Sequence, residues 1–128
     1  MPHLIVEYTA NLAEVIDTDI LLPKLHDVLL AKPTLFPIGG IRSRAIPLHA
    51  YYVADGSETS DAFVHLTFKI GAGRSQEEKE TTCQELFTVL TDHFASEWSK
   101  RGIALSLELA EFGEAGTLKK NNIHARFK

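Results

Sequence analysis

The second residue of the chain is a proline, and its position decides what its nitrogen can do. Inside a chain, a proline nitrogen is a tertiary amide without basicity, but Pro2 becomes a free secondary amine once Met1 is removed. A free α-amino group has a pKa of about 8, and burial or nearby cations lower it because they disfavour the protonated form. Such an amine can take up and return a proton near neutral pH. Pro2 is therefore a candidate general base for a proton shift.

Three arginines are candidates for binding an anionic substrate. The guanidinium group binds a carboxylate through two parallel hydrogen bonds and can stabilise negative charge that develops on an enolate oxygen. Arg42 and Arg44 alternate along a predicted strand, and Arg74 precedes a predicted helix. We expect the side chains of Arg42 and Arg44 on opposite faces of that strand. Only one of them, preferably Arg42, would then contact a substrate.

Other reactive residue types have structural interpretations here. Ser75 stands three residues before Glu78, which is the spacing of a helix capping box rather than evidence for a nucleophile. Cys83 is the only cysteine and lies in an amphipathic pattern, which favours a packed thiol. The six histidines include no pair at metal-ligand spacing on one element, so we expect no metal site. The segment 71–73 is rich in glycine but lacks the Gly-Lys-Ser/Thr of a phosphate loop.

Composition and charge restrict the class of protein. The chain has 128 residues, of which 45% are hydrophobic, and this suits one domain with a single core. The net charge is −4 and the 13 basic residues are spread along the chain, which argues against a nucleic-acid or anionic-membrane surface. The first residues lack a basic leader and no segment approaches the roughly 18 apolar residues of a membrane helix. We therefore expect a cytoplasmic protein.

Hydrophobic periodicity predicts the order strand, helix, strand, twice over. The predicted strands are His3–Tyr8, Ile41–Val53, Phe63–Ile70 and Ile103–Leu109, and the predicted helices are Ile20–Leu30 and one from Ser75 to Gly102. Pro23 is tolerable only in the first turn of its helix, and Pro47 requires a bulge or an edge strand. The buried stripe expected on the second helix is Cys83, Leu86, Phe87, Leu90, Phe94 and Trp98.

These elements predict an α+β architecture built from two similar units. One unit covers about residues 2–56 and the other about 62–112, followed by a polar tail over 113–128. The crossover lengths favour parallel pairing within each unit. Four strands with two helices on one face leave the other face bare. Since apolar residues alternate on both faces, we expect other subunits to cover it.

The segment Gly73–Thr81 resembles the motif of the 4-oxalocrotonate tautomerase family, placed after a short strand and opening a helix. Members of that family begin with a proline. When Arg74 is aligned to the arginine of the family, Val64 stands in the place of the proline. The first unit shows the reverse, because it has Pro2 but carries Leu12 in the place of the arginine. Complementary loss of this kind is typical of a duplicated tautomerase.

Within that superfamily the chain resembles the 5-carboxymethyl-2-hydroxymuconate isomerases over nearly its whole length. The similar segments are Pro2–Glu7, Gly40–Arg44, Phe63–His65, Lys69–Ser75 and Asn121–Ala125. The resemblance implies a tautomerase fold, a homotrimer, no cofactor, Pro2 as the catalytic residue, and a pocket that contains Arg74 with Arg42 or Arg44. It does not decide whether Asn121, Asn122 or His124 contact the ligand or a neighbouring subunit.

The resemblance also implies a reaction. The enzyme would convert 5-carboxymethyl-2-hydroxymuconate to its 2-oxo tautomer, 5-oxopent-3-ene-1,2,5-tricarboxylate, in the catabolism of homoprotocatechuate and 4-hydroxyphenylacetate. Pro2 would remove the proton of the 2-hydroxyl group, directly or through water, and deliver one to carbon 5. Two alternatives remain open from the sequence. One is a tautomerase that acts on another enol acid, and the other is a regulatory module that binds a small ligand without catalysis.

Overall fold

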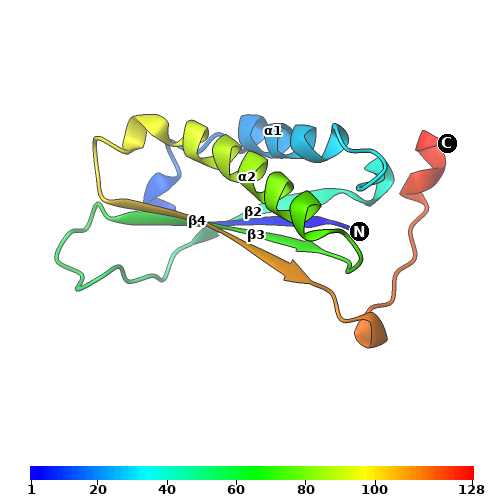
Figure 1. Cartoon of the computed structure of the whole chain (residues 1–128). Coiled ribbons are helices and arrows are strands. Elements are labelled where there is room, and N and C mark those ends of the chain that lie inside the picture. The colour runs from blue at the N-terminus through cyan, green and yellow to red at the C-terminus, as the bar shows by residue number, and fades with distance from the viewer.

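A four-stranded sheet with two helices on one of its faces makes up the fold, as the computed structural model of all 128 residues shows (Figure 1). The elements are β1 (His3–Thr9), α1 (Thr18–Leu30), β2 (Arg42–Leu48), β3 (Ala62–Ile70), α2 (Gln76–His93) and β4 (Ile103–Glu111). Short 3-10 turns lie at Ala10–Leu12, Ile38–Gly40, Ala95–Glu97, Glu114–Gly116 and Ile123–Phe127. The predicted α+β class is confirmed.

The strands have the order β2-β1-β3-β4 in the sheet. β1 pairs with β2 and β3 pairs with β4 in parallel, whereas β1 and β3 are antiparallel. The parallel pairing predicted within each unit is therefore confirmed. β2 is an edge strand, as Pro47 requires, because proline has no N–H to donate to a further strand. The register places His3 beside Arg42 on one side and beside Lys69 on the other.

The second strand is shorter than the sequence predicts, ending at Leu48 rather than at Val53. The residues that follow form a turn closed by local hydrogen bonds. The Tyr52 hydroxyl donates to the carbonyl of Asp55 at 2.9 Å, and the backbone N–H of Ser57 donates to the Asp55 carboxylate at 3.0 Å. Aspartate favours such a turn because its carboxylate accepts a hydrogen bond from the backbone N–H two residues later. The chain therefore leaves the sheet five residues earlier than the sequence predicts.

Helix α1 begins at Thr18, two residues before the predicted start, so Pro23 lies in its second turn and not in its first. A proline there leaves the carbonyl four residues before it without an intrahelical donor. That carbonyl belongs to Asp19, which is exposed, so water can satisfy it. The first turn is thus not the only place where this helix accepts a proline.

Helix α2 has the predicted start but not the predicted end. The backbone N–H of Glu78 donates to Ser75 Oγ at 3.1 Å, and the N–H of Ser75 donates to the Glu78 carboxylate at 2.8 Å, so the capping box is confirmed. The helix ends at His93 instead of near Gly102. A 3-10 turn follows that buries Glu97, which forms an ion pair with Arg101 at 3.0 Å. The backbone leaves the helical path at Phe94, whose φ of −103° and ψ of 13° differ from those of an α-helix.

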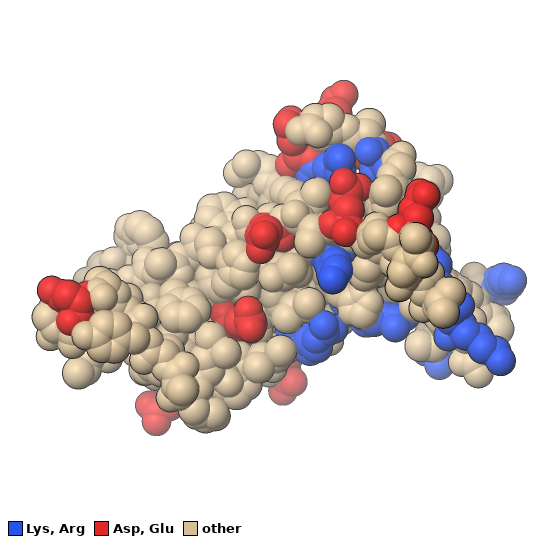
Figure 2. Space-filling view, turned by 90° about the horizontal axis from the view of Figure 1, so that it is seen from below, with Lys and Arg blue, Asp and Glu red and all other residues tan.

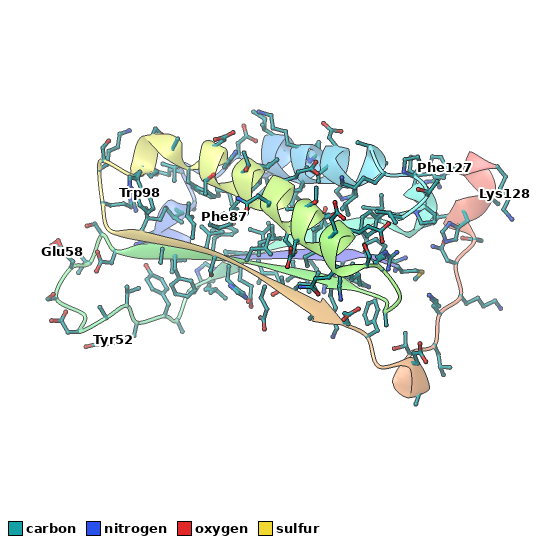
Figure 3. The ribbon with its side chains drawn as sticks, in the orientation of Figure 1. Tyr52, Glu58, Phe87, Trp98, Phe127 and Lys128 are labelled. Atoms are coloured by element: carbon teal, nitrogen blue, oxygen red, sulfur yellow. The ribbon has the colours of Figure 1, made fainter.

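The core lies between the helices and one face of the sheet. Its fully buried large side chains are Phe36, Phe68, Phe94, Leu4, Leu12, Leu21, Leu25, Leu29, Leu66, Ile70, Leu86 and Leu90. From the predicted α2 stripe, Cys83 and Phe87 are half-buried at its edge. The prediction that Trp98 belongs to this stripe is wrong. Trp98 lies beyond the end of the helix and is 67% exposed. Figure 3 shows Trp98 at the end of the molecule opposite Phe127.

The other face of the sheet carries no helix (Figure 1). In β1, Leu4 and Val6 are buried under the helices, while Ile5 and Glu7 point the opposite way and are half-buried. This open face is mixed rather than apolar. It combines Ile5 and Phe63 with polar side chains such as His65, which lies 2.7 Å from the Ser106 hydroxyl. None of the helices has the length and apolar character needed to cross a membrane.

Candidate active site

A cavity of about 440 Å³ lies at the end of the sheet where the chain begins. Its walls are Met1, Pro2, Pro37, Gly40, Arg74, Lys119, Asn121 and His124. These residues come from the start of β1, the 3-10 turn before β2, the loop before α2 and the C-terminal tail, which lie at the same end of the fold (Figure 1). The structure therefore brings Pro2 and Arg74 together, although they are far apart in the sequence.

The loop before α2 and the first half of the chain hold Arg74 in place. Its Nη1 donates to the carbonyl of Gly71 at 2.9 Å and its Nη2 donates to the carbonyl of Leu35 at 2.5 Å. The guanidinium carbon lies 4.7 Å from the centre of the Phe36 ring, a cation–π contact. The Nε atom is buried and has no hydrogen-bond partner. Arg74 is thus positioned before any ligand arrives, and Nη1 and Nη2 each keep one N–H beyond the one bonded to a carbonyl.

The environment of the N-terminal amine is positively charged. Partial burial lowers the pKa of the Met1 amine, and the charges of Lys119, Arg74 and Arg42 lower it further. Pro2 is buried directly after it, and its carbonyl accepts a hydrogen bond from the backbone N–H of Arg42 at 3.1 Å. Arg74 and Lys119 also line the same cavity as Pro2. An amine formed there would be held in its neutral, basic form.

Arg42 and Arg44 lie on the same face of the sheet, so the expectation of opposite faces is wrong. Residues two apart in a strand share a face, and only the intervening residue points the other way. That residue is Ser43, whose hydroxyl lies 2.7 Å from His26 Nε2 on α1. Arg42 Nη2 donates to Met1 Sδ at 3.4 Å, whereas Arg44 Nη1 lies 3.1 Å from His3 Nδ1. Arg42 therefore contacts a wall of the cavity, and Arg44 lies outside it.

The C-terminal tail forms one wall through contacts with the turn at Ile38–Gly40. Asn121 Nδ2 donates to the carbonyl of Gly39 at 2.8 Å, and the Asn121 side-chain oxygen accepts from the N–H of Ile123 at 2.6 Å. A Cβ atom on Gly39 would lie 2.7 Å from the Cα of His124, so the turn and the tail meet without room for a side chain. Asn121 and His124 thus line the cavity, a role that the sequence left open.

Lys119 is the cavity residue that sequence patterns do not single out. Nothing in its local sequence distinguishes it from Lys120, and its position depends on how the tail folds back. The available signal was its place two residues before Asn121, where the segment that resembles the isomerases begins. Figure 2 shows the Lys and Arg side chains of the open sheet face gathered in the half of the molecule that carries the N-terminus and the tail.

The remaining candidates lie away from this cavity. Ser75 is exposed and forms the helix cap described above. Cys83 is an unpaired thiol, and burial raises its pKa, which disfavours the reactive thiolate. No three His, Cys, Asp or Glu side chains are close enough together to hold a metal ion.

Comparison with known proteins agrees with the geometry. The family model described as 5-carboxymethyl-2-hydroxymuconate isomerase matches residues 2–127. The 5-carboxymethyl-2-hydroxymuconate Delta-isomerase of Escherichia coli is 41% identical over 128 residues, which covers 100% of both chains. The crystal structure of a 5-carboxymethyl-2-hydroxymuconate isomerase from Deinococcus radiodurans R1 is 61% identical, covers 99% of this chain and 94% of its own, and gives a TM-score of 0.96.

A more distant structure shares the fold alone. It is described as a "Q0 fused 4-OT wild type symmetric trimer" and is 18% identical, with a TM-score of 0.60. The match covers 91% of this chain and 94% of that one. The tautomerase fold expected from the sequence is confirmed.

Proposed function

Because the chain belongs to the 5-carboxymethyl-2-hydroxymuconate isomerase family, we propose that it converts 5-carboxymethyl-2-hydroxymuconate to its 2-oxo tautomer. The O–H bond at carbon 2 breaks, the double bonds shift along the chain, and a new C–H bond forms at carbon 5. The proton count is unchanged and no electrons leave the substrate. The protein is thus an isomerase, and its residues need only move a proton and stabilise negative charge.

The observation that carries the proposal is the single cavity shared by Pro2 and Arg74, with Lys119 in its wall and Arg42 beside it. Pro2 is the proposed base after removal of Met1. Its nitrogen takes the proton of the 2-hydroxyl group, directly or through water, and returns one to carbon 5. The surrounding positive charge keeps the amine neutral between turnovers.

Arg74 and Arg42 are the proposed substrate-binding residues. Arg74 is fixed by two carbonyls and a ring, so its free donors can meet a carboxylate or the developing 2-oxyanion without reorganisation. Arg42 offers the donor that Met1 Sδ occupies, and that donor becomes available when Met1 leaves. Arg44 lies on the same face but contacts His3, which is not part of the cavity wall, so we do not propose it as a substrate ligand.

The experiment combines intact mass with kinetics. A processed preparation that lacks Met1 should convert 5-carboxymethyl-2-hydroxymuconate rapidly, which is followed as the loss of the dienol absorbance. Pro2→Ala and Arg74→Ala should each lower kcat/KM by about 100-fold or more, the usual contribution of a general base or an oxyanion donor. A Pro2→Ala enzyme with unchanged rates would refute the catalytic assignment. Equal turnover of simple enols would favour a tautomerase of another enol acid.

The open sheet face supports a homotrimer. A half-buried surface that includes Ile5 and Phe63 lies without cover in the single chain. The related structure described as a symmetric trimer shares this fold. We expect three copies of the 14.2 kDa chain in sedimentation or mass measurements. A stable monomer would contradict this. We also expect the enzyme in the cytoplasm, which fractionation against a cytoplasmic marker tests.

A further inference from the structure

The proposed substrate carries one negative group more than a simple 2-hydroxymuconate, because a carboxymethyl arm is attached to the conjugated chain. A simple 2-hydroxymuconate has two carboxylates and the arm adds a third. Arg74 and Arg42 account for two anionic groups. The cavity contains one further cation, the ammonium of Lys119 in its tail-side wall.

We propose that Lys119 binds the carboxylate of the carboxymethyl arm and thereby selects tricarboxylate enols over dicarboxylate enols. The inference rests on the proposed function and adds a specificity-determining residue to it. The ammonium is a compact charge on a flexible stem, which suits an arm that rotates about single bonds better than a rigid guanidinium does. Pro2 and Arg74 would act on the part of the substrate that all such enols share.

Lys119 is free to receive an anion. The ion pairs of the chain involve Lys32, His65, Lys79, Lys100 and Arg101, and none includes Lys119. No side-chain hydrogen bond ties its ammonium to another residue. An unpaired cation that lines a cavity and faces no carboxylate of the protein is available to a carboxylate of the ligand.

The backbone that carries Lys119 is nevertheless well placed. Asn121, two residues later, is anchored to the Gly39 carbonyl at 2.8 Å, and His124 packs against Gly39 where no Cβ would fit. These contacts fix the tail against the turn before β2. The ammonium is also close enough to the chain start that its charge acts on the N-terminal amine ahead of Arg74 and Arg42.

The test compares two substrates in two variants. Lys119→Met removes the charge from the cavity, and Lys120→Met is the matched control because Lys120 is the adjacent lysine but does not line the cavity. We expect Lys119→Met to lower kcat/KM for 5-carboxymethyl-2-hydroxymuconate by about 10- to 100-fold, as loss of a charged hydrogen bond does. Measured at a pH above the acidic limb of both enzymes, kcat/KM for 2-hydroxymuconate should change less than about threefold. Lys120→Met should leave both unchanged.

The ratio of kcat/KM for 5-carboxymethyl-2-hydroxymuconate to kcat/KM for 2-hydroxymuconate distinguishes binding of the arm from an effect on both substrates. A change in the basicity of Pro2 would alter both substrates equally, so an equal loss in Lys119→Met, or no loss, overturns the proposal. Lys119→Arg should retain most of the selectivity. If the wild-type enzyme turns over neither substrate, the proposed function fails, which is a different outcome from an unchanged ratio.

Displacing the tail provides a second test that leaves the lysine in place. Gly39→Ala introduces a Cβ that would lie 2.7 Å from the His124 Cα and so pushes the tail from the turn. We expect the ratio of kcat/KM for the tricarboxylate to that for the dicarboxylate to fall toward the ratio of Lys119→Met. Circular dichroism should show that the Gly39→Ala protein is folded. A folded Gly39→Ala enzyme with wild-type selectivity would show that the position of the tail does not matter and would count against the proposal.

Discussion

Arg42 Nη2 donates to the Sδ of Met1 across 3.4 Å, and Asn121 Nδ2 approaches the same sulfur at 3.6 Å. Sulfur is a weak acceptor, so two strong donors are held by a poor partner. Met1 therefore blocks the site in two ways. It acylates the nitrogen of Pro2, and its side chain occupies space beside donors suited to substrate oxygens.

Retention of Met1 should abolish activity. A preparation in which mass spectrometry detects Met1 should turn over at least about 100-fold more slowly than the processed enzyme, because the base does not exist as an amine. Aminopeptidase treatment that removes Met1 should restore the rate. If the unprocessed protein, shown by mass to be free of the processed form, is fully active, Pro2 is not the base.

Arg42 and Arg44 should differ in effect although they share a face. Arg42→Ala should lower kcat/KM by about 10- to 100-fold through loss of a charged hydrogen bond to the substrate. Arg44→Ala should change it by less than about threefold, since Arg44 is exposed and contacts His3 rather than the cavity. Steady-state kinetics of both variants decide this. A larger effect of Arg44→Ala would reverse the assignment.

Local signals in the sequence were sufficient for several elements of the fold and site. Ser75 and Glu78 specify the start of α2 through contacts within one helical turn, and the alternation in β3 and β4 specifies strands directly. The proximity of Pro2 and Arg74 followed from the family motif. No periodicity could have supplied that proximity, because the two residues meet only through the pairing of β1 with β3.

Other features depend on tertiary packing. Trp98 continues the helical spacing of α2, but the helix ends at His93. Beyond that point the spacing no longer places a side chain on the buried face of the helix, and Trp98 is exposed. Lys119 and Lys120 are the same residue type, and one of them lines the cavity because Asn121 and His124 hold the tail against Gly39. Such contacts join distant segments and leave no local pattern in the sequence.

Removing the charge of Lys119 should also shift the pH profile. Positive charge near the amine lowers its pKa, so Lys119→Met should raise the pKa of the Pro2 amine. A higher pKa means that more of the base is protonated in acid, and the acidic limb of kcat/KM should move to higher pH. Lys119→Arg keeps the charge and should keep the wild-type limb. A shift to lower pH in Lys119→Met would contradict the electrostatic account.

Ser75 should matter for stability and not for chemistry. Ser75→Ala removes the acceptor for the Glu78 N–H and should cost about 1 kcal/mol of unfolding free energy. The kcat value should stay within about threefold of wild type, apart from any disturbance of the neighbouring Arg74. Denaturant unfolding and kinetics on the same sample measure both. A loss of activity at the level of Pro2→Ala would instead identify Ser75 as catalytic.

His93 links the two helices in a way that should make stability depend on pH. The backbone N–H of Asp17, at the start of α1, donates to His93 Nε2 at 3.1 Å, which requires the unprotonated nitrogen. Burial lowers the pKa of His93 below 6.5, Lys24 lowers it further, and Asp17 partly opposes this. The unfolded chain therefore binds more protons than the folded chain in this range. The stabilisation is complete above pH 6.5 and is lost as pH falls through the pKa of folded His93.

Denaturant unfolding at pH 7.5 and at pH 5 should accordingly show a lower midpoint in acid. His93→Gln keeps a hydrogen-bond acceptor without a titrating ring, so its midpoint should change less between the two pH values. Some dependence should remain, because burial also lowers the pKa of His26 and of His3. His49→Gln, at an exposed position just after β2, is the matched control and should retain the full wild-type dependence. If His93→Gln and wild type lost the same stability in acid, protonation of His93 could not be the cause of that loss. The loss would then have to originate at His26 or His3.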